Sequence, residues 1–112
     1  MLPKKHRVTT NKEFRQIYAK GRFHKGPFFN LKLIPNKLDF SRFGVVISKK
    51  TLAKATARNQ VKRQVRESLK DLKPKFKPGF DVVIIITTSP GERSFATIKE
   101  QVTQKLKEAG VL

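Results

Sequence analysis

The stretch from Lys54 to Glu67, KATARNQVKRQVRE, combines helix-forming residues with a high density of cations. At about 100° per residue, Val61 and Val65 fall on one side of a helix, and Leu69 continues that stripe. The adjoining arc of the same helix carries polar and basic side chains: Arg58, Asn59, Lys62, Arg63, Arg66 and Lys70. The stretch therefore predicts an amphipathic helix that packs its apolar stripe on a core and presents cations beside it.

The signs of the charges on this helix favour a binding surface over a solvated one. A helix that only needs solvation mixes acids and bases at i, i+4 spacing. Here Arg58, Lys62 and Arg66 repeat one sign at that spacing, which costs helix stability unless an anion neutralises it. The arginine side chain also presents a planar fork that fits paired phosphate oxygens. The alternative is an ordinary basic surface helix, and the one-sided arc favours polyanion binding over it.

The whole chain, like this helix, has an excess of basic residues. Its 112 residues include 26 Lys and Arg against 8 Asp and Glu, which gives a formal net charge of +18. Such self-repulsion indicates a densely anionic partner, with nucleic acid as the first candidate and an anionic membrane surface as the weaker one. A hydrophobic content of 38% is enough for one modest core. We therefore expect a single nucleic-acid-binding domain over residues 1–112, with residues 1–8 as a flexible basic arm.

Missing residue types and motifs exclude several classes of function. The chain has no cysteine, which excludes cysteine-based zinc sites and suits a reducing cytoplasm. The apolar run from Val82 to Ile86 is too short to span a membrane. Nucleotide-binding glycine motifs are absent, and His6 and His24 have no triad or zinc partners. We therefore expect no catalytic residue, metal ligand, small-molecule substrate or membrane association in this chain.

The remaining patterns alternate between helix and strand. Thr10 and Glu13 form a T-x-x-E capping box, and Gly21 ends the helix that they open. The basic helix has Thr51 or Thr56 as candidate caps. The elements predicted in order are helix 10–20, strands 22–25, 28–34 and 43–48, helix 55–73, strand 82–86 and helix 94–109. This order predicts an α+β or mixed α/β sandwich with helices against one sheet.

The last strand and the last helix are apolar enough to form much of the core. Residues 82–86, VVIII, predict a central strand that is buried on both faces. The last helix, which Ser94 can cap, carries a stripe that we assign to the core: Phe95, Ile98, Val102, Leu106 and Ala109. A crossover from strand 43–48 to strand 82–86 would bring the basic helix beside the sheet.

Several side chains are candidates for contact with RNA bases and phosphates. Phe14 and Tyr18 lie one turn apart, and the helix pattern favours the core for both, with a base-stacking platform as the alternative. In strand 28–34, Phe29 and Lys32 fall on opposite faces. Lys49 and Lys50 follow the third strand and would extend the electropositive surface of the basic helix.

An ordered set of motifs resembles the bacterial ribonuclease P protein component. The loose pattern R-N-x-x-K-R-x-x-R-[EQ] runs from Arg58 to Glu67, after S-K-[KR] at Ser48–Lys50. The pattern N-x-x-F-x-x-[IV]-[YF] runs from Asn11 to Tyr18. A G-x-D strand start at Gly79 and an S-[FY] helix start at Ser94 complete the set. The resemblance therefore extends over nearly the whole chain.

The resemblance implies a fold and a division of labour. Family members adopt an αβββαβα sandwich like domain 2 of ribosomal protein S5, with a left-handed βαβ crossover that handedness preferences alone argue against. They join a catalytic RNA that cleaves precursor tRNA to release its 5′ leader. The RNA performs the hydrolysis with bound Mg²⁺, so the protein needs neither a cofactor nor a catalytic residue. The implied partners are ribonuclease P RNA and precursor tRNA, and the implied location is the cytoplasm.

The resemblance also implies two groups of site residues. The catalytic RNA and its phosphates would be held by Arg58, Asn59, Lys62, Arg63, Arg66 and Lys70. The single-stranded leader would lie in a cleft contacted by Phe14, Tyr18, Phe29, Lys32, Lys49 and Lys50. Some relatives carry an aromatic residue at the position of Lys32, so phosphate pairing would replace stacking there. Many have glycine at the position of Ala53.

Two other functions remain open from the sequence. A ribosomal or general RNA-chaperone protein would share the charge of this chain and its fold. A stand-alone nuclease would need an active site, and none is visible in the sequence. Reconstitution with the catalytic RNA and precursor tRNA separates the subunit from the chaperone, because no stimulation would favour the chaperone. Cleavage of precursor tRNA by the purified protein, free of RNA, would establish the nuclease.

Overall fold

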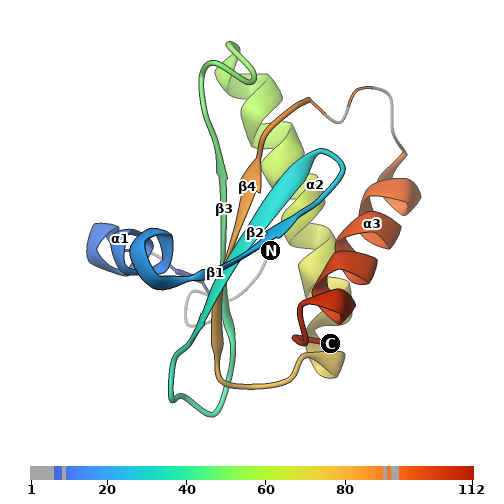
Figure 1. Ribbon diagram of the computed structural model, residues 1–112. Coiled ribbons are helices and arrows are strands. Elements are labelled where there is room, and N and C mark those ends of the chain that lie inside the picture. The colour runs from blue at the N-terminus through green and yellow to red at the C-terminus, as the bar shows by residue number, and fades with distance from the viewer. Residues whose placement is uncertain (1–6, 9, 90, 92–93) are drawn as a thin grey trace.

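The described part of the chain, residues 7–8, 10–89, 91 and 94–112 of the computed structural model, contains three α-helices and four strands. In order they are α1 (Asn11–Lys20), β1 (Arg22–Lys25), β2 (Phe29–Pro35), β3 (Arg42–Ile47), α2 (Ala55–Leu72), β4 (Phe80–Ile86) and α3 (Phe95–Glu108) (Figure 1). A short 3-10 helix, η2 (Lys73–Lys75), follows α2, because Pro74 cannot continue an α-helix. The predicted α+β class and the order αβββαβα are confirmed.

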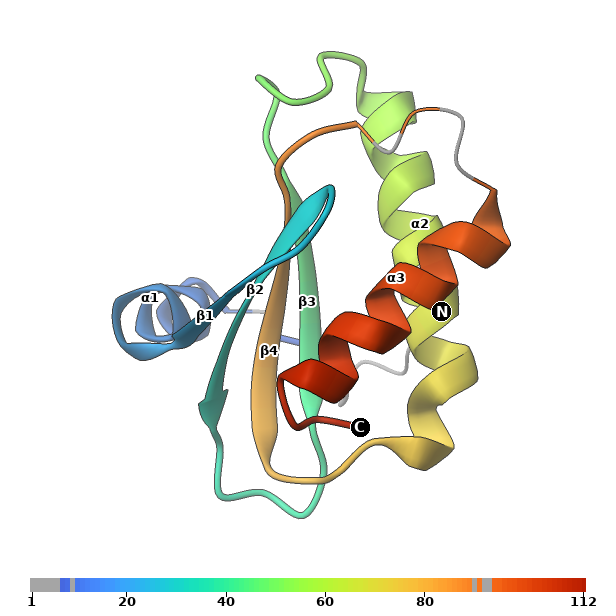
Figure 2. The same ribbon diagram turned by 45° about the vertical axis from the view of Figure 1, so that its right-hand side comes forward.

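The four strands form one mixed sheet with β4 in its interior. The strand order is β1-β2-β4-β3, in which β2 is antiparallel to β1 and β4 and β3 is parallel to β4. The chain therefore crosses from β3 through α2 to β4. Seen from the helices with β3 and β4 pointing up, β4 lies to the left of β3 (Figure 2). The crossover is left-handed, as the family resemblance implied and against the usual preference.

The face of the sheet beneath α2 and α3 is fully covered. Figure 2 shows both helices on this side and α1 on the other. The main core fills the space between the sheet and the helices α2 and α3. Its side chains include Phe29, Leu31, Leu33, Val45, Val61, Val65, Leu69, Val82, Ile84, Ile98, Val102 and Leu106. The predicted stripe of α3 is confirmed from Ile98 onward, but the prediction is wrong for Phe95, which is 39% exposed at the start of the helix.

The opposite face is covered only in part, by α1 and the segment before it. Val8, Ile17 and Val83 form a small buried cluster there. Half-buried apolar side chains surround it: Phe14, Ile34, Val46 and Ile85. A helix of ten residues is about 15 Å long, which is too short to cover the sheet. The uncovered remainder lies beside the C-terminal half of α1.

Two glycines occupy positions where a side chain would clash, one at the end of α1 and one on the strand beneath it. Gly21 has a φ of −70°, so its role is steric: a Cβ there would lie 2.4 Å from the Ile17 carbonyl oxygen. Gly44 on β3 lies beneath the Phe14 ring, and a Cβ would meet that ring at 2.9 Å. The predicted capping box at the other end of the helix is confirmed, with the Thr10 hydroxyl accepting from the Glu13 N–H at 3.2 Å.

A buried carboxylate on β4, Asp81, is linked to α1 through Arg42 of the edge strand β3. Asp81 accepts hydrogen bonds from Arg42 Nε at 2.9 Å, from Arg42 Nη2 at 2.6 Å and from Asn36 Nδ2 at 2.8 Å. The remaining Arg42 nitrogen, Nη1, pairs with Glu13 of α1. The hydrogen bond with Asp81 raises the pKa of Arg42. This network holds the start of α1 over the sheet.

The segment before α1 and the start of α2 both differ from expectation. Residues 1–6 of the predicted flexible arm lie outside the described residues, whereas Arg7 and Val8 pack on the free edge of β3. The Val8 N–H donates to the Phe43 carbonyl oxygen at 2.9 Å. At the start of α2, neither Thr51 nor Thr56 is the cap, because Lys54 holds that position without a side-chain hydrogen bond.

Candidate nucleic-acid interface

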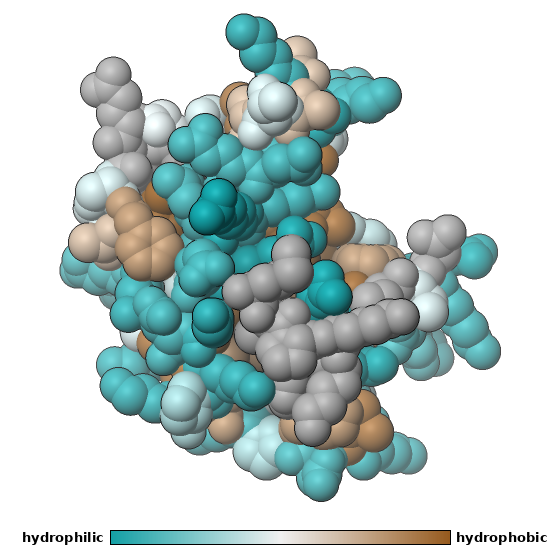
Figure 3. Space-filling model, turned by 180° about the vertical axis from the view of Figure 1, so that it is seen from behind, coloured by the Kyte–Doolittle hydropathy of each residue, from teal (hydrophilic) through white to brown (hydrophobic). Residues whose placement is uncertain are grey.

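The basic side chains of α2 lie on one flank of the helix. Lys62 and Arg66 are half-buried next to the apolar stripe, and Arg63 lies further out toward solvent. The opposite flank faces α3, since Asp71 accepts from Lys99 of α3 at 3.2 Å. The cations therefore point away from α3 and toward the β3 edge of the sheet. On the face shown in Figure 3, hydrophilic side chains predominate and apolar ones form small separate patches.

Arg66 meets a second arginine at the edge of β3. Arg7 and Arg66 line a hollow of about 170 Å³, together with Phe14 and Gly44. Burial, and to a smaller extent the charge of Arg7, lowers the pKa of Arg66. Arg7 Nε is buried without a hydrogen-bond partner, and no carboxylate of the described residues pairs with either side chain. Two guanidinium groups thus share one hollow, and an anion would neutralise them.

Further out on α2, a shallower hollow lies among polar side chains. It has a volume of about 270 Å³ and is lined by Asn59, Arg63, Arg66 and Glu67. Lys70 is exposed one turn beyond it. Five of the six predicted RNA-binding residues of α2 therefore lie on the same accessible flank.

The sixth, Arg58, has a local structural role. Its Nη1 donates to the carbonyl oxygens of Leu52 and Ala53, at 2.8 and 2.7 Å. These bonds close the loop between β3 and α2 from the helix side. Lys49 and Lys50 are exposed in the same loop.

A groove lies on the part of the sheet that α1 leaves uncovered. Its volume is about 490 Å³, and its lining residues are Tyr18, Val46, Ile47, Ser48, Thr51, Ile85, Ile86 and Thr87. The Tyr18 side chain forms one wall and is 39% exposed. Lys49 and Lys50 lie at the rim, between Ser48 and Thr51. An open apolar floor with an aromatic wall and a cationic rim is suited to an unpaired nucleic-acid strand.

The two candidate aromatics of α1 differ in exposure. The rings of Phe14 and Tyr18 are stacked with their centroids 6.5 Å apart. Phe14 is half-buried against Gly44, so the core interpretation holds for most of its surface. Tyr18 is exposed, which the helix pattern alone did not favour and the family resemblance did. Partial burial raises the pKa of the Tyr18 hydroxyl.

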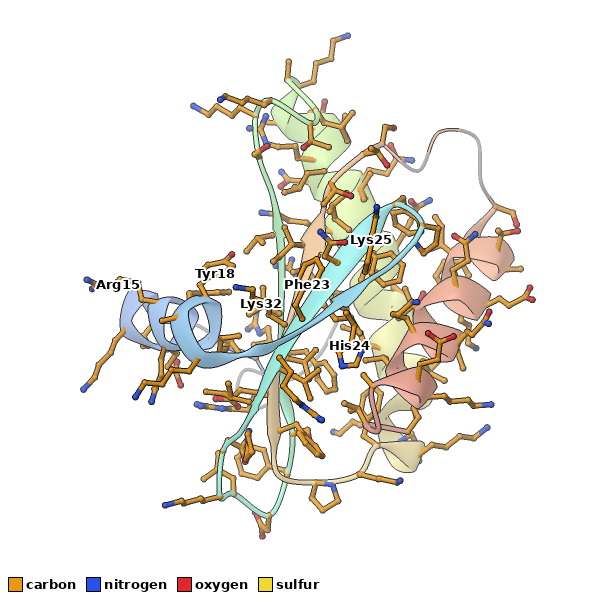
Figure 4. All side chains as sticks on the ribbon, viewed as in Figure 1. Arg15, Tyr18, Phe23, His24, Lys25 and Lys32 are labelled. Carbon is orange, nitrogen blue, oxygen red and sulfur yellow. The ribbon has the colours of Figure 1, made fainter. Side chains whose placement is uncertain are left out.

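Of the two candidate cleft residues on β2, Lys32 lies beside the groove wall and Phe29 lies in the main core. Lys32 Nζ donates to the Tyr18 carbonyl oxygen at 2.6 Å and lies 6.0 Å from the centroid of the Tyr18 ring (Figure 4). The ammonium thus binds the C-terminal turn of α1, where a cation is favourable. Phe29 is 0% exposed, in the main core beneath α2 and α3. Its predicted contact with a bound strand is therefore wrong, because the ring faces away from the groove.

The described residues contain no cluster of three or more His, Asp or Glu side chains suited to a metal ion. In the same part of the chain, no helix has the length and apolarity needed to cross a membrane. Among the described residues, the candidate nucleic-acid contacts are the hollows on α2 and at β3, and the groove beside α1.

Comparison with known proteins identifies the family. The Ribonuclease P family model matches residues 2–110. The chain belongs to the ribonuclease P protein family. A ribonuclease P protein component from Synechocystis sp. is 33% identical over 99% of this chain and 90% of its own length. Another, from Clostridium botulinum strain Langeland, is 34% identical over 96% of this chain and 97% of its own length.

Solved ribonuclease P proteins have the same fold. A Staphylococcus aureus ribonuclease P protein, a mutant with defective mRNA degradation activity, superposes with a TM-score of 0.89 at 30% identity, over 97% of this chain and 92% of that one. The protein from Thermotoga maritima superposes with a TM-score of 0.84 at 31% identity, over 91% and 96%. These similarities confirm the family and the fold inferred from the motifs.

Membership in the ribonuclease P family establishes what the chain does. It is the protein subunit of ribonuclease P, a ribonucleoprotein that processes the 5′ ends of tRNA and in which RNA performs the catalysis. Its partner is ribonuclease P RNA. Sequence reasoning missed Arg7, which it assigned to a flexible arm. In the sequence, only the apolar residue Val8 beside it indicated that this segment packs on the rest of the protein.

Proposed function

We propose that this ribonuclease P subunit holds the catalytic RNA on the basic flank of α2 and the 5′ leader of precursor tRNA in the groove beside α1. The observation that carries the proposal is the pair of guanidinium groups in one hollow, Arg7 and Arg66, without a carboxylate among the described residues. A phosphate in that hollow would neutralise both groups. The hollow also contains Phe14, so it adjoins the helix that forms the groove wall.

On the RNA side, the contacts are electrostatic. Arg63, Lys62 and Lys70 would neutralise backbone phosphates, and Asn59 can donate to them through its amide. Arg66 would contribute a planar fork to a bound phosphate together with Arg7. Arg58 contributes indirectly, through the loop that it closes.

On the leader side, Tyr18 would stack on a base and Lys49 and Lys50 would pair with phosphates. Stacking accepts any base, which suits leaders of variable sequence. Neutralising roughly six phosphates of a single strand gives a log–log salt slope of about −4. In this proposal Mg²⁺ belongs to the RNA of the holoenzyme, and the setting is the cytoplasm.

The test on the RNA side uses the double substitution Arg7→Ala with Arg66→Ala. We expect binding to ribonuclease P RNA to weaken at least about tenfold and the salt dependence to become shallower, because two phosphate contacts are lost. The isolated protein should be no less stable in chemical denaturation, because a repulsion is removed. The matched control is Lys99→Ala with Lys107→Ala on α3. Equal losses in both double variants would mean that α2 is not the specific RNA-binding surface.

The test on the leader side compares precursor tRNA with mature tRNA. Tyr18→Ala in the reconstituted holoenzyme should weaken binding of the leader-bearing precursor about tenfold, the loss typical of one stacked base, and leave mature tRNA binding unchanged. Equal losses for both ligands would refute the groove assignment. A protein that leaves RNA-dependent cleavage unstimulated would instead act as a general RNA chaperone.

A further inference from the structure

Phe23 on β1 has the largest exposure among the large hydrophobic side chains of the described residues. It is 55% exposed, compared with 39% for Tyr18 and 40% for Leu38. Within the described part of the chain, the Phe23 ring makes no contact with another aromatic ring or with a cation. An aromatic ring in this position contributes little to the core. More than half of its surface is accessible to a ligand.

The strand register places Phe23 on the same side of the sheet as the groove. Phe23 pairs with Lys32, and Lys32 pairs in turn with Val83 beneath α1. Directly paired residues of neighbouring strands share a face. Figure 4 shows Tyr18, Lys32 and Phe23 in the angle between α1 and the sheet. His24, the next residue, points toward α3 instead (Figure 4).

Lys32 connects the two exposed rings. Its Nζ lies 6.0 Å from the centroid of the Tyr18 ring. Its Cβ lies about 4.5–5.5 Å from that of Phe23, as in any directly opposed antiparallel pair. A strand that stacks one base on Tyr18 and another on Phe23 would therefore carry its backbone phosphates past an ammonium group.

All the Asp, Glu, Lys and Arg positions near Phe23 along the chain are occupied by Lys or Arg. From residue 14 to residue 38 the chain has no Asp or Glu. The same segment contains six cations: Arg15, Lys20, Arg22, Lys25, Lys32 and Lys37. Lys25 lies two residues after Phe23 on the same face of β1 and is exposed. An exposed ring among cations matches a single-stranded nucleic acid, whose bases stack and whose phosphates are anionic.

We propose that Phe23 is a second stacking platform for single-stranded RNA, and that it extends the leader path from Tyr18 across Lys32 to the free edge of β1. This inference rests on the proposed leader-binding role of the groove. Phe23 determines how many leader nucleotides the subunit holds. A leader too short to reach β1 gains nothing from the ring.

The first experiment introduces a fluorescent reporter at this position. The chain contains no tryptophan, so Phe23→Trp provides the only tryptophan emission. In the reconstituted holoenzyme, precursor tRNA with a long leader should quench its emission by base stacking, and mature tRNA should not. The matched control is Phe95→Trp on α3, whose parent ring is 39% exposed and outside the groove. Absence of quenching, or equal quenching by mature tRNA, overturns the inference.

The second experiment measures affinity in the same holoenzyme. Phe23→Ala and Phe23→Leu should each weaken binding of a long-leader precursor about tenfold, whereas Phe23→Tyr should retain it, because only a ring can stack. Shortening the leader should abolish the difference between Phe23→Ala and the parent protein. Denaturation midpoints should be unchanged, since the side chain is exposed.

The two proposals fail in different ways. If Tyr18→Ala weakens leader-dependent binding and Phe23→Ala does not, the path ends in the groove, and only the extension to β1 is wrong. If neither substitution changes leader-dependent binding, the proposed function of the groove is wrong as well. If Phe23→Ala weakens binding of mature tRNA equally, the ring contacts another part of the RNA and the extension is refuted.

Discussion

The two faces of the sheet are made by the same strands but differ in what covers them. On β2, Leu31 and Leu33 point into a core that is closed by helices of 18 and 14 residues. Lys32, between them in sequence, points to the other face, where only the ten residues of α1 lie. The covered face supplies most of the buried apolar surface. The half-covered face leaves a groove that can bind a ligand without opening the main core.

The largest expected effect is a difference in the free energy of unfolding between substitutions on the two faces of the sheet. Phe29→Ala removes a fully buried ring from the covered face and should lower the free energy of unfolding by about 3–5 kcal/mol. The measurement is urea denaturation of the isolated protein. Tyr18→Ala, on the half-covered face, should change the same quantity by less than about 1 kcal/mol. Similar losses in both variants would mean that the groove wall is part of the core.

An intermediate effect concerns the contact that holds α1 on the half-covered face. Gly44→Ala places a methyl group against the Phe14 ring and should destabilise the protein by about 1–3 kcal/mol through overpacking. Phe14→Ala combined with Gly44→Ala should cost less than the sum of the two single substitutions, because the clash is removed. Additive losses in this double-mutant cycle would mean that the two side chains do not interact.

The smallest expected effect concerns the cation beneath Tyr18. Lys32→Met removes the hydrogen bond to the Tyr18 carbonyl oxygen and should lower the free energy of unfolding by about 0.5–1 kcal/mol. The thermal midpoint of the isolated protein measures it. Lys37→Met, a substitution of an exposed lysine in the β2–β3 connection, is the control. A loss of several kcal/mol would show that Lys32 belongs to the core and is not a groove residue.

Local patterns predicted much of this protein because they depend on neighbours in sequence. Helical periodicity identified the buried stripe of α2 and its basic flank, and a run of β-branched residues identified β4 as the central strand. Alternation along β2 placed Phe29 and Lys32 on opposite faces, which is correct. Assigning Phe29 to the groove contradicted that alternation, since Leu31 and Leu33 on its face are core residues.

Other features depend on segments that are distant in sequence. The pairing of Arg7 and Val8 with β3 brings a second guanidinium group to Arg66, and no local pattern shows it. Pairing between β1 and β2 places Phe23 beside Lys32. The exposure of Tyr18 likewise depends on where α1 crosses the sheet and on Gly44, which is on a different strand.

The sequence by itself determined the order of the elements, which face of each element is apolar, and the presence of a cationic surface on α2. These features follow from periodicity and charge patterns that extend over only a few residues. Only the tertiary structure decided which face of the sheet stays open and which cations share a hollow. It also set the left-handed path of the crossover from β3 to β4. These outcomes follow from packing between distant segments: α2 and α3 seal one face, and α1 is too short to seal the other.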